Sequence, residues 1–207
     1  MNTPTNAGDA ERLRKRNRGL LLLILALFFG SMLVAGALRF SDWRPAGMKN
    51  KGELLQPPVD LRTRAPKLAS GAAYAWNPGE RQWRILAVPP AGCGEACDKT
   101  ARDLDVLWRS VGHNADKVDV LWLCAEAGCR VPAPLRDDRT LRVLAPDEAL
   151  RAALAPAAAS GAGDRDTGAA GVPVYIVDPN GFVILRYAPG SNLMGVREDL
   201  SKLLKLI

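Results

Sequence analysis

The most uniform pattern in the chain is an apolar run near its N-terminus. Residues 19–38, "GLLLLILALFFGSMLVAGAL", contain no charged side chain. A helix rises about 1.5 Å per residue, so this run is long enough to span the roughly 30 Å hydrocarbon core of a bilayer. The pattern therefore predicts a transmembrane helix. A cleaved signal peptide is the alternative, because Ala35-Gly36-Ala37 has the form of a cleavage site, although the run exceeds the usual signal core of roughly 7–15 residues.

Beyond residue 69 the apolar positions alternate between strand-like and helix-like spacing, whereas 39–69 are rich in Pro, Lys and Arg and show no sustained period. We therefore expect an extended connector over 39–69 and a folded domain over 70–207. The elements expected in the domain are a hairpin over 74–88, a helix over 95–112, strands over 117–124 and 140–145, a short helix opened by Asp147, a hairpin over 172–188 around Pro179-Asn180-Gly181, and a final amphipathic helix. This order predicts an α/β domain in which a central mixed sheet is flanked by helices.

Within these elements the spacing separates core positions from surface positions. Trp83, Trp108 and Trp122 fall at apolar phases of their elements and are expected in the core. The final helix places its apolar side chains on one face, and its charged residues are expected on the outside. The apolar face consists of Val196, Leu200, Leu203, Leu204 and Ile207, and the polar face of Arg197, Glu198, Asp199 and Lys202.

Charge sets the expected topology. The 207-residue chain has a net charge of +6. Half of this charge lies before residue 39, where Arg12, Arg14, Lys15, Arg16 and Arg18 outnumber Asp9 and Glu11. Positive charge beside a transmembrane helix stays in the cytoplasm, so 1–18 are expected to form a cytoplasmic basic tail and the domain to be exported. The rest of the chain mixes basic with acidic residues too evenly to favour nucleic-acid binding.

All four cysteines lie on the exported side, where disulfides persist. Cys93 precedes a predicted helix and Cys97 lies in its first turn, in the stretch "GCGEACDK". The helix dipole and free backbone N–H groups favour a thiolate at this place. Two soft thiolates suit Cu(I), and the same pair can oxidise to a disulfide. The pair is therefore a candidate copper site or redox centre, with Cys93 as the attacking thiol, and a purely structural disulfide is the alternative.

A second cysteine pair, Cys124 and Cys129, is joined as "CAEAGC". If the strand that ends at Cys124 runs parallel to the strand before Cys93, both pairs emerge at the same rim of the sheet. We hypothesise that the second pair exchanges disulfides with the first or shares a Cu(I) site with it. A disulfide that only pins the loop is the alternative. A four-thiolate zinc site would normally show paired short spacings, which are absent here.

The order of strand, cysteine turn, helix and a later Val172-Pro173 step before a hairpin resembles the thioredoxin superfamily. The spacing of Cys93 and Cys97, the N-terminal anchor, "NKGELLQPP" and "VDPNGFVILRY" resemble more specifically the SCO family of cytochrome c oxidase assembly proteins of Gram-negative bacteria. The resemblance implies that Pro173 is cis and faces the cysteines. It also implies a periplasmic domain anchored in the inner membrane, whose partners are the copper-receiving subunit of the oxidase or other copper chaperones.

One departure from the SCO pattern concerns histidine. SCO proteins complete their copper site with a distal histidine in the loop before the final hairpin, and 155–171 contain none here. His113 is the single histidine, and about 1.5 Å per helical residue places it roughly 24 Å from Cys97. Cu(I) carriage by two thiolates and thiol reduction through Cys93, Cys97 and Pro173 both remain open. A scaffold without chemistry and a general periplasmic thiol–disulfide oxidoreductase are the alternatives.

Overall fold

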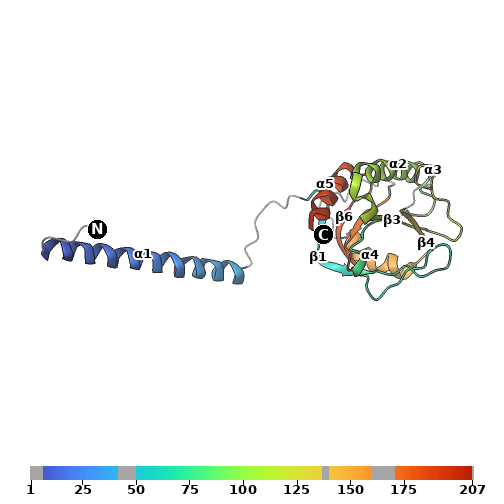
Figure 1. The fold of residues 1–207 in the computed structure, drawn as a ribbon. Helices are drawn as coiled ribbons and strands as arrows, with labels where there is room; N and C mark the ends of the chain where they lie inside the picture. Colours follow the sequence, from blue (N-terminus) through green and yellow to red (C-terminus); the bar gives the residue numbers. More distant parts are fainter. Residues whose placement is uncertain (1–6, 42–49, 137–139, 160–170, 207) are drawn as a thin grey trace. The chain divides into compact units, whose positions relative to one another are not determined.

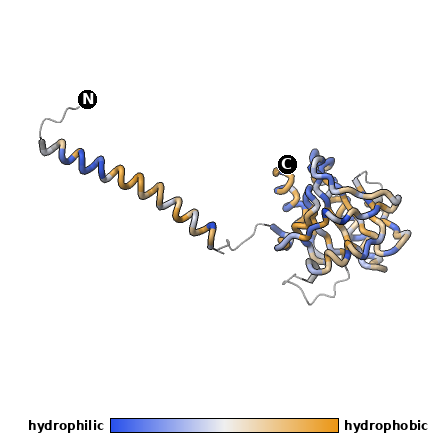
Figure 2. Tube along the Cα trace, turned by 90° about the horizontal axis from the view of Figure 1, so that it is seen from below, coloured by the Kyte–Doolittle hydropathy of each residue, from blue (hydrophilic) through white to orange (hydrophobic). Residues whose placement is uncertain are grey.

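The computed structural model describes residues 7–41, 50–136, 140–159 and 171–206, and the chain divides into two units, 1–48 and 49–207. The first unit contains α1 (Ala7–Phe40), a single long helix (Figure 1). Figure 2 shows polar residues in its first turns and apolar residues along most of its remaining length. In the described ranges, α1 is the one helix long and apolar enough to cross a membrane, over Ala10–Phe40. The predicted span of 19–38 lies inside it.

The second unit is built on one mixed sheet of six strands in the order β1-β6-β5-β2-β3-β4. The parallel half consists of β2, β3 and β4, while β5 runs antiparallel to β2, and β6 and β1 continue antiparallel from there. This is the predicted fold class. The strands are β1 (Glu53–Asp60), β2 (Trp83–Ala87), β3 (Val118–Leu123), β4 (Leu141–Leu144), β5 (Val174–Val177) and β6 (Phe182–Tyr187).

Helices cover both faces of this sheet (Figure 1). One face packs against α2, α3 and α5, and the other packs against α4 and the segment that contains Leu61 and Tyr74. The helices are α2 (Gly94–Val111), α3 (Ala133–Arg136), α4 (Glu148–Ala159) and α5 (Met194–Leu203), with short 3-10 turns at Pro78–Glu80, Gly112–Lys117 and Leu204–Leu206. The predicted loop over 155–171 begins inside α4, and 160–170 fall outside the described residues.

Strand periodicity explains how the two core layers form. Alternate side chains of a strand point to opposite faces of the sheet, so Ile85 and Val120 join the layer beneath α2 while Leu86 and Leu121 join the layer beneath α4. Trp83 and Trp122 are buried, as predicted, and Trp108 packs half-buried against the same core. The hairpin of β5 and β6 forms as predicted, since Asp178 and Gly181 close the turn by a 3.1 Å backbone hydrogen bond.

The first predicted hairpin, over 74–88, is wrong. Asn77 does not open a β-turn between two strands; its side chain caps the 3-10 turn of Pro78–Glu80 by accepting a hydrogen bond from the Gly79 amide. Tyr74 lies off the sheet, buried against its α4 side. Both edges of β2 are occupied by strands distant in sequence, β3 and β5, so the preceding segment has no edge to pair with.

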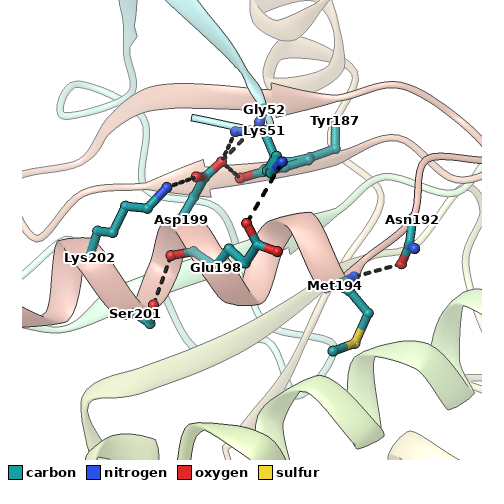
Figure 3. Close-up of polar contacts among 9 residues, drawn as sticks. All are labelled: Lys51, Gly52, Tyr187, Asn192, Met194, Glu198, Asp199, Ser201 and Lys202. Atoms are coloured by element: carbon teal, nitrogen blue, oxygen red, sulfur yellow. Dashed lines mark hydrogen bonds and ion pairs between the residues drawn. The ribbon is translucent and has the colours of Figure 1, made fainter. Parts of the chain in front are cut away.

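The expected connector over 39–69 contains a strand of the sheet. Within it, β1 pairs with β6 at the sheet edge, and Leu55 and Leu61 are buried in the core. This docking depends on Asp199 of α5 (Figure 3), whose carboxylate accepts hydrogen bonds from the amides of Lys51 at 2.6 Å and Gly52 at 2.9 Å. The prediction that Asp199 faces outside is therefore wrong. Its side chain turns toward the start of β1 because those two amides need an acceptor, and only 2% of the residue is exposed.

Candidate functional site

The first cysteine pair lies where the connection from β2 enters α2. The strand pairing of β2 ends with a 3.1 Å hydrogen bond from the Val88 amide to the Pro173 carbonyl, and the chain then turns into Cys93, the residue immediately before α2. Gly92 and Gly94 flank this cysteine with φ of 65° and 47°, angles that side chains with a Cβ rarely adopt. The sequence Gly-Cys-Gly therefore encodes the sharp turn that presents Cys93 at the helix start.

Cys93 and Cys97 are joined as a disulfide, with their Cα atoms 5.5 Å apart. Cys97 lies in the first turn of α2, as predicted, and both residues are half-buried. Because free N–H groups and the positive end of the helix dipole gather at a helix start, a reduced sulfur at this place is stabilised as thiolate. A stabilised thiolate is both a better leaving group and a ready attacking group in thiol–disulfide exchange.

The second pair lies at the end of β3. Cys124 continues the strand pairing through its amide, which donates to the Leu144 carbonyl at 3.0 Å, and it is bonded to Cys129 with a Cα separation of 5.6 Å. Cys124 is buried with 3% exposure, whereas Cys129 is half-buried. β2 and β3 pair in parallel, which is the condition on which the expectation of a shared rim depends. Both cysteine pairs therefore follow the carboxyl ends of neighbouring parallel strands.

A cavity of about 300 Å³, here called the rim cavity, is lined by Cys93, Cys97 and Cys129 together with Trp122 and Pro132. A second cavity of about 390 Å³, here called the outer cavity, is lined by Cys93, Glu95, Lys99, Gly171, Val172 and Leu193. Cys93 lines both cavities. Cys93 therefore borders two spaces. The rim cavity is shared with Cys129 of the second pair, and the outer cavity is bordered by α2 and the segment before β5.

The resemblance-based expectation for Pro173 is wrong in its geometry. Within the described residues, the cis peptide bond is the one before Pro57, and the bond before Pro173 is trans. Pro173 lines neither of the two cavities, and its carbonyl is engaged with Val88 of the sheet. The backbone that borders the outer cavity is instead that of Gly171 and Val172.

The two cysteine pairs contribute sulfur donors at the rim, and Asp98 and Glu126 also line the rim cavity. Across the described ranges, no group of three or more His, Cys, Asp or Glu side chains is arranged to hold a metal ion. His113 is exposed in the 3-10 turn at the opposite end of α2 and lines neither cavity. Cys93 and Cys97, once reduced, offer two thiolates, a set that fits Cu(I) and lacks the nitrogen and oxygen donors that Cu(II) prefers.

Arg151 of α4 is a site residue that sequence analysis missed. One guanidinium nitrogen, Nη2, donates to the carbonyls of Pro89 at 3.0 Å, Leu123 at 3.2 Å and Cys124 at 3.0 Å. Burial lowers the pKa of Arg151 from its usual value. The same nitrogen therefore joins the segment that leads to Cys93 with the segment that carries Cys124. Nothing in the spacing of α4 signals this role, because it depends on two strand ends brought together by the sheet.

A comparison with protein families finds one match, which covers the part of the chain that carries both cysteine pairs. The family model described as the transmembrane-like, thioredoxin-like, C-terminal domain matches residues 83–207. The chain belongs to this family. The matched region of the thioredoxin-like domain starts at β2 and includes both cysteine pairs, so it covers the whole candidate site. No curated protein sequence matches the chain.

Sco proteins are among the solved structures to which the chain is similar. BsSco, a member of the Sco family of cytochrome c oxidase assembly proteins in which a disulfide switch was identified, is 10% identical, with coverage of 79% of this chain and 100% of its own, and a TM-score of 0.50. Yeast Sco1 with copper bound is 12% identical, covering 78% and 96%, with a TM-score of 0.49. Xanthomonas campestris peroxiredoxin Q is 15% identical, covering 76% and 98%, with a TM-score of 0.44. At such identities a likeness bears on the fold alone, and of these three structures BsSco reaches a TM-score of 0.50.

Proposed function

We propose that this chain is a membrane-anchored thiol–disulfide reductant that acts outside the cytoplasm in the assembly of cytochrome c oxidase. One observation carries the proposal: the Cys93–Cys97 disulfide is held, half-buried, at the start of α2 and borders the outer cavity. A redox pair needs a stabilised thiolate, access for a partner, and a second thiol close by. The cysteine turn offers all three.

The reduced pair would act in two exchange steps. The Cys93 thiolate attacks one sulfur of a partner disulfide, forms a mixed disulfide, and releases the other partner sulfur, which takes up a proton. The Cys97 thiolate then attacks Cys93, closes the Cys93–Cys97 disulfide, and releases the second partner thiol. Two electrons pass from the cysteine pair to the partner. The outer cavity, with the backbone of Gly171 and Val172 at its border, would receive an extended partner segment during both steps.

The partner that we propose is the copper-receiving subunit of the oxidase, whose cysteines must be reduced before copper can bind to them. Support comes from the Sco fold of the chain, since BsSco is a member of a family of cytochrome c oxidase assembly proteins. A second candidate function is the carriage of Cu(I) as cargo by the thiolates of Cys93 and Cys97, because Sco1 is found with copper bound. Cys129, which lines the same rim cavity, would be an additional sulfur donor.

We propose that α1 anchors the domain in the bacterial inner membrane, with the N-terminus in the cytoplasm and 49–207 in the periplasm. The apolar length of α1 and the basic residues before position 19 support this topology. Fusion of a periplasm-dependent reporter after Ile207 should give an active enzyme, and fusion of the same reporter before Met1 should not. The reverse pattern would overturn the orientation.

The test of the proposed function replaces both Cys93 and Cys97 by serine in the full chain within its own cells. We expect loss of oxidase activity and accumulation of the oxidised copper-receiving subunit, measured by thiol alkylation. Val106→Ser, at an exposed position on the same helix, is the matched control. Unchanged oxidase activity with a stable double variant would favour a scaffold, and thiol defects spread over many periplasmic proteins would favour a general oxidoreductase. Anaerobic Cu(I) titration of the reduced full chain tests the cargo role separately.

A further inference from the structure

The second cysteine pair has no part in the steps described so far, yet it borders the same space as the first. Cys129 lines the rim cavity together with Cys93 and Cys97. Cys124 belongs to the core layer beneath α2, and the other three cysteines pack against that same layer. Strand alternation places Cys124 on the α2 face of the sheet, since it follows Val120 and Trp122 in steps of two. The four sulfurs therefore lie on one face and at one rim.

Two further contacts keep the pairs together. The short helix α3, which follows the Cys129 loop, packs against α2, which begins at the first pair. On the other face, Arg151 Nη2 donates to the carbonyls of Pro89, Leu123 and Cys124 and so fixes the roots of both cysteine segments. A disulfide that merely pinned its own loop would need neither contact. The arrangement limits the movement of one pair relative to the other.

The two cysteines of the second pair differ in access. Cys124 is 3% exposed and does not line the rim cavity, whereas Cys129 is half-buried and does. Attack across the cavity can therefore start only from Cys129. Cys124 remains adjacent as the thiol that completes the exchange. This is the same division of roles as that between Cys93 and Cys97 at the outer cavity.

We propose that Cys124 and Cys129 form a second redox centre that passes reducing equivalents to Cys93 and Cys97 across the rim cavity; this inference rests on the proposed function of the first pair. The Cys129 thiolate attacks Cys97 of the oxidised first pair, forms a Cys97–Cys129 bond, and releases Cys93 as a thiolate at the start of α2. Cys124 then attacks Cys129, closes the Cys124–Cys129 disulfide and releases Cys97, so two electrons move to the first pair. A dithiol protein of the extracytoplasmic space, exchanging at Cys129, restores the second pair; free glutathione disulfide reacts more slowly there than at Cys93, because Cys129 does not lie at a helix start.

The border position of Cys93 fits this relay. It lines the rim cavity and the outer cavity, so the thiolate released by the internal exchange is already beside the space where a partner disulfide would bind. Cys93 is also the better leaving group for the first step, because it sits directly at the helix start, where a thiolate is stabilised. Reduction of the pair from within the molecule leaves the outer cavity free for the partner.

The relay is tested on the full chain in detergent, fully reduced without oxygen and then mixed with glutathione disulfide. The wild type should consume about two equivalents per chain and the Cys124→Ser/Cys129→Ser variant about one. In the Cys93→Ser/Cys97→Ser variant, closure of Cys124–Cys129 should slow at least about tenfold. Closure at the wild-type rate in that variant would overturn the relay and leave the proposed function standing. Absence of reaction in the Cys124→Ser/Cys129→Ser variant would instead overturn the proposed function.

Two further measurements make the test independent of any one variant. The wild type is first mixed with limiting glutathione disulfide and its disulfides are mapped by mass spectrometry. The Cys93–Cys97 disulfide should form first and be replaced later by Cys124–Cys129, with no further glutathione released. A disulfide that stays at Cys93–Cys97 would overturn the relay. Under mild oxidation, Cys93→Ser/Cys124→Ser should form the Cys97–Cys129 bond. The matched Cys93→Ser/Cys129→Ser variant should not form a Cys97–Cys124 bond, and equal yields would count against the rim cavity as the route.

Discussion

The hydroxyl of Tyr187 on β6 donates a 2.8 Å hydrogen bond to the carboxylate of Asp199 on α5. The same carboxylate accepts from the amides of Lys51 and Gly52 and from the ammonium of Lys202 (Figure 3). Tyr187 approaches so closely that a Cβ on Gly52 would lie 2.6 Å from its Cζ atom. The start of β1 is thus fixed both by hydrogen bonds and by lack of space.

Replacement of Asp199 by asparagine should destabilise the domain by about 1.5–3 kcal/mol, because hydrogen bonds to a buried charged acceptor are lost or weakened. Glu198→Gln on the same helix is the control. Glu198 is exposed, and its one ion pair in the described residues, with Lys51, is long at 4.0 Å. That variant should change stability by less than about 0.5 kcal/mol. Urea denaturation of the full chain in detergent, followed by tryptophan fluorescence, measures both. Equal losses in the two variants would contradict the role of Asp199.

Acid should selectively remove the contribution of Asp199. Burial alone would raise the pKa of this carboxyl, but hydrogen bonds from Gly52, Tyr187, Lys202 and Lys51 lower it below its usual value. A lowered folded-state pKa gives stability that is present above the unfolded-state pKa of about 3.9 and is lost as the pH falls through the folded-state value. The stability gap between wild type and Asp199→Asn should therefore be full at pH 7 and shrink below about pH 4. A constant gap down to complete unfolding would contradict this.

A second buried network, on the α4 face, should respond to alkali. The Tyr74 hydroxyl donates to Asp119 at 2.9 Å and accepts from Nε of Arg84 at 3.0 Å, and burial, more than any charge nearby, raises the pKa of Tyr74 to about 12. Its contribution to stability should be complete below an unfolded-state pKa of about 10 and decline above it. Tyr74→Phe should cost about 1–2 kcal/mol at pH 7. Ultraviolet titration of tyrosinate compares the two proteins, and a group ionising near pH 10 at position 74 would refute the prediction.

Cys97→Ser should trap the proposed partner. Without the resolving thiol, the mixed disulfide between Cys93 and a partner persists, because Cys97 is the thiol assigned to displace it. Non-reducing gels of membranes should show a new high-mass species that reductant removes. The Cys93→Ser/Cys97→Ser variant should lack that species. Its appearance in the double variant would assign partner attack to Cys129 instead of Cys93.

Local signals in the sequence were sufficient for several elements of the fold. The helical spacing of Ala101, Leu104 and Leu107 identified α2, and Pro179-Asn180-Gly181 identified the final hairpin. Both elements can be predicted from a few neighbouring residues. The helix has one apolar face, and the hairpin has a turn sequence that favours it. The parallel pairing of β2 and β3 was only a condition in the sequence analysis, and the structure meets it.

Long-range features escaped prediction for a physical reason. In β1, the stretch Gln56-Pro57-Pro58 lacks two amide donors and reads as connector, yet the strand forms because β6 offers an edge and Asp199 binds its entry. Asp199 itself lies in the polar phase of its helix, and its amide partners are almost the whole domain away in sequence. Arg151 likewise binds carbonyls of two other segments. The cis geometry expected for Pro173 came from family resemblance, and no signal in the surrounding residues supports it.

The hydrogen bonds from the amides of Lys51 and Gly52 to Asp199 also affect how the domain would respond to force. Lys51 and Gly52 lie near the start of the described domain, just after Asn50, so tension carried along the chain from α1 would enter the domain at this carboxylate and at the edge strand β1. The cysteine segments follow β2 and β3, which are separated from β1 by β6 and β5. A force applied through the chain that precedes Lys51 would therefore act first on the edge of the sheet at β1, and the geometry of the two cysteine pairs would be preserved.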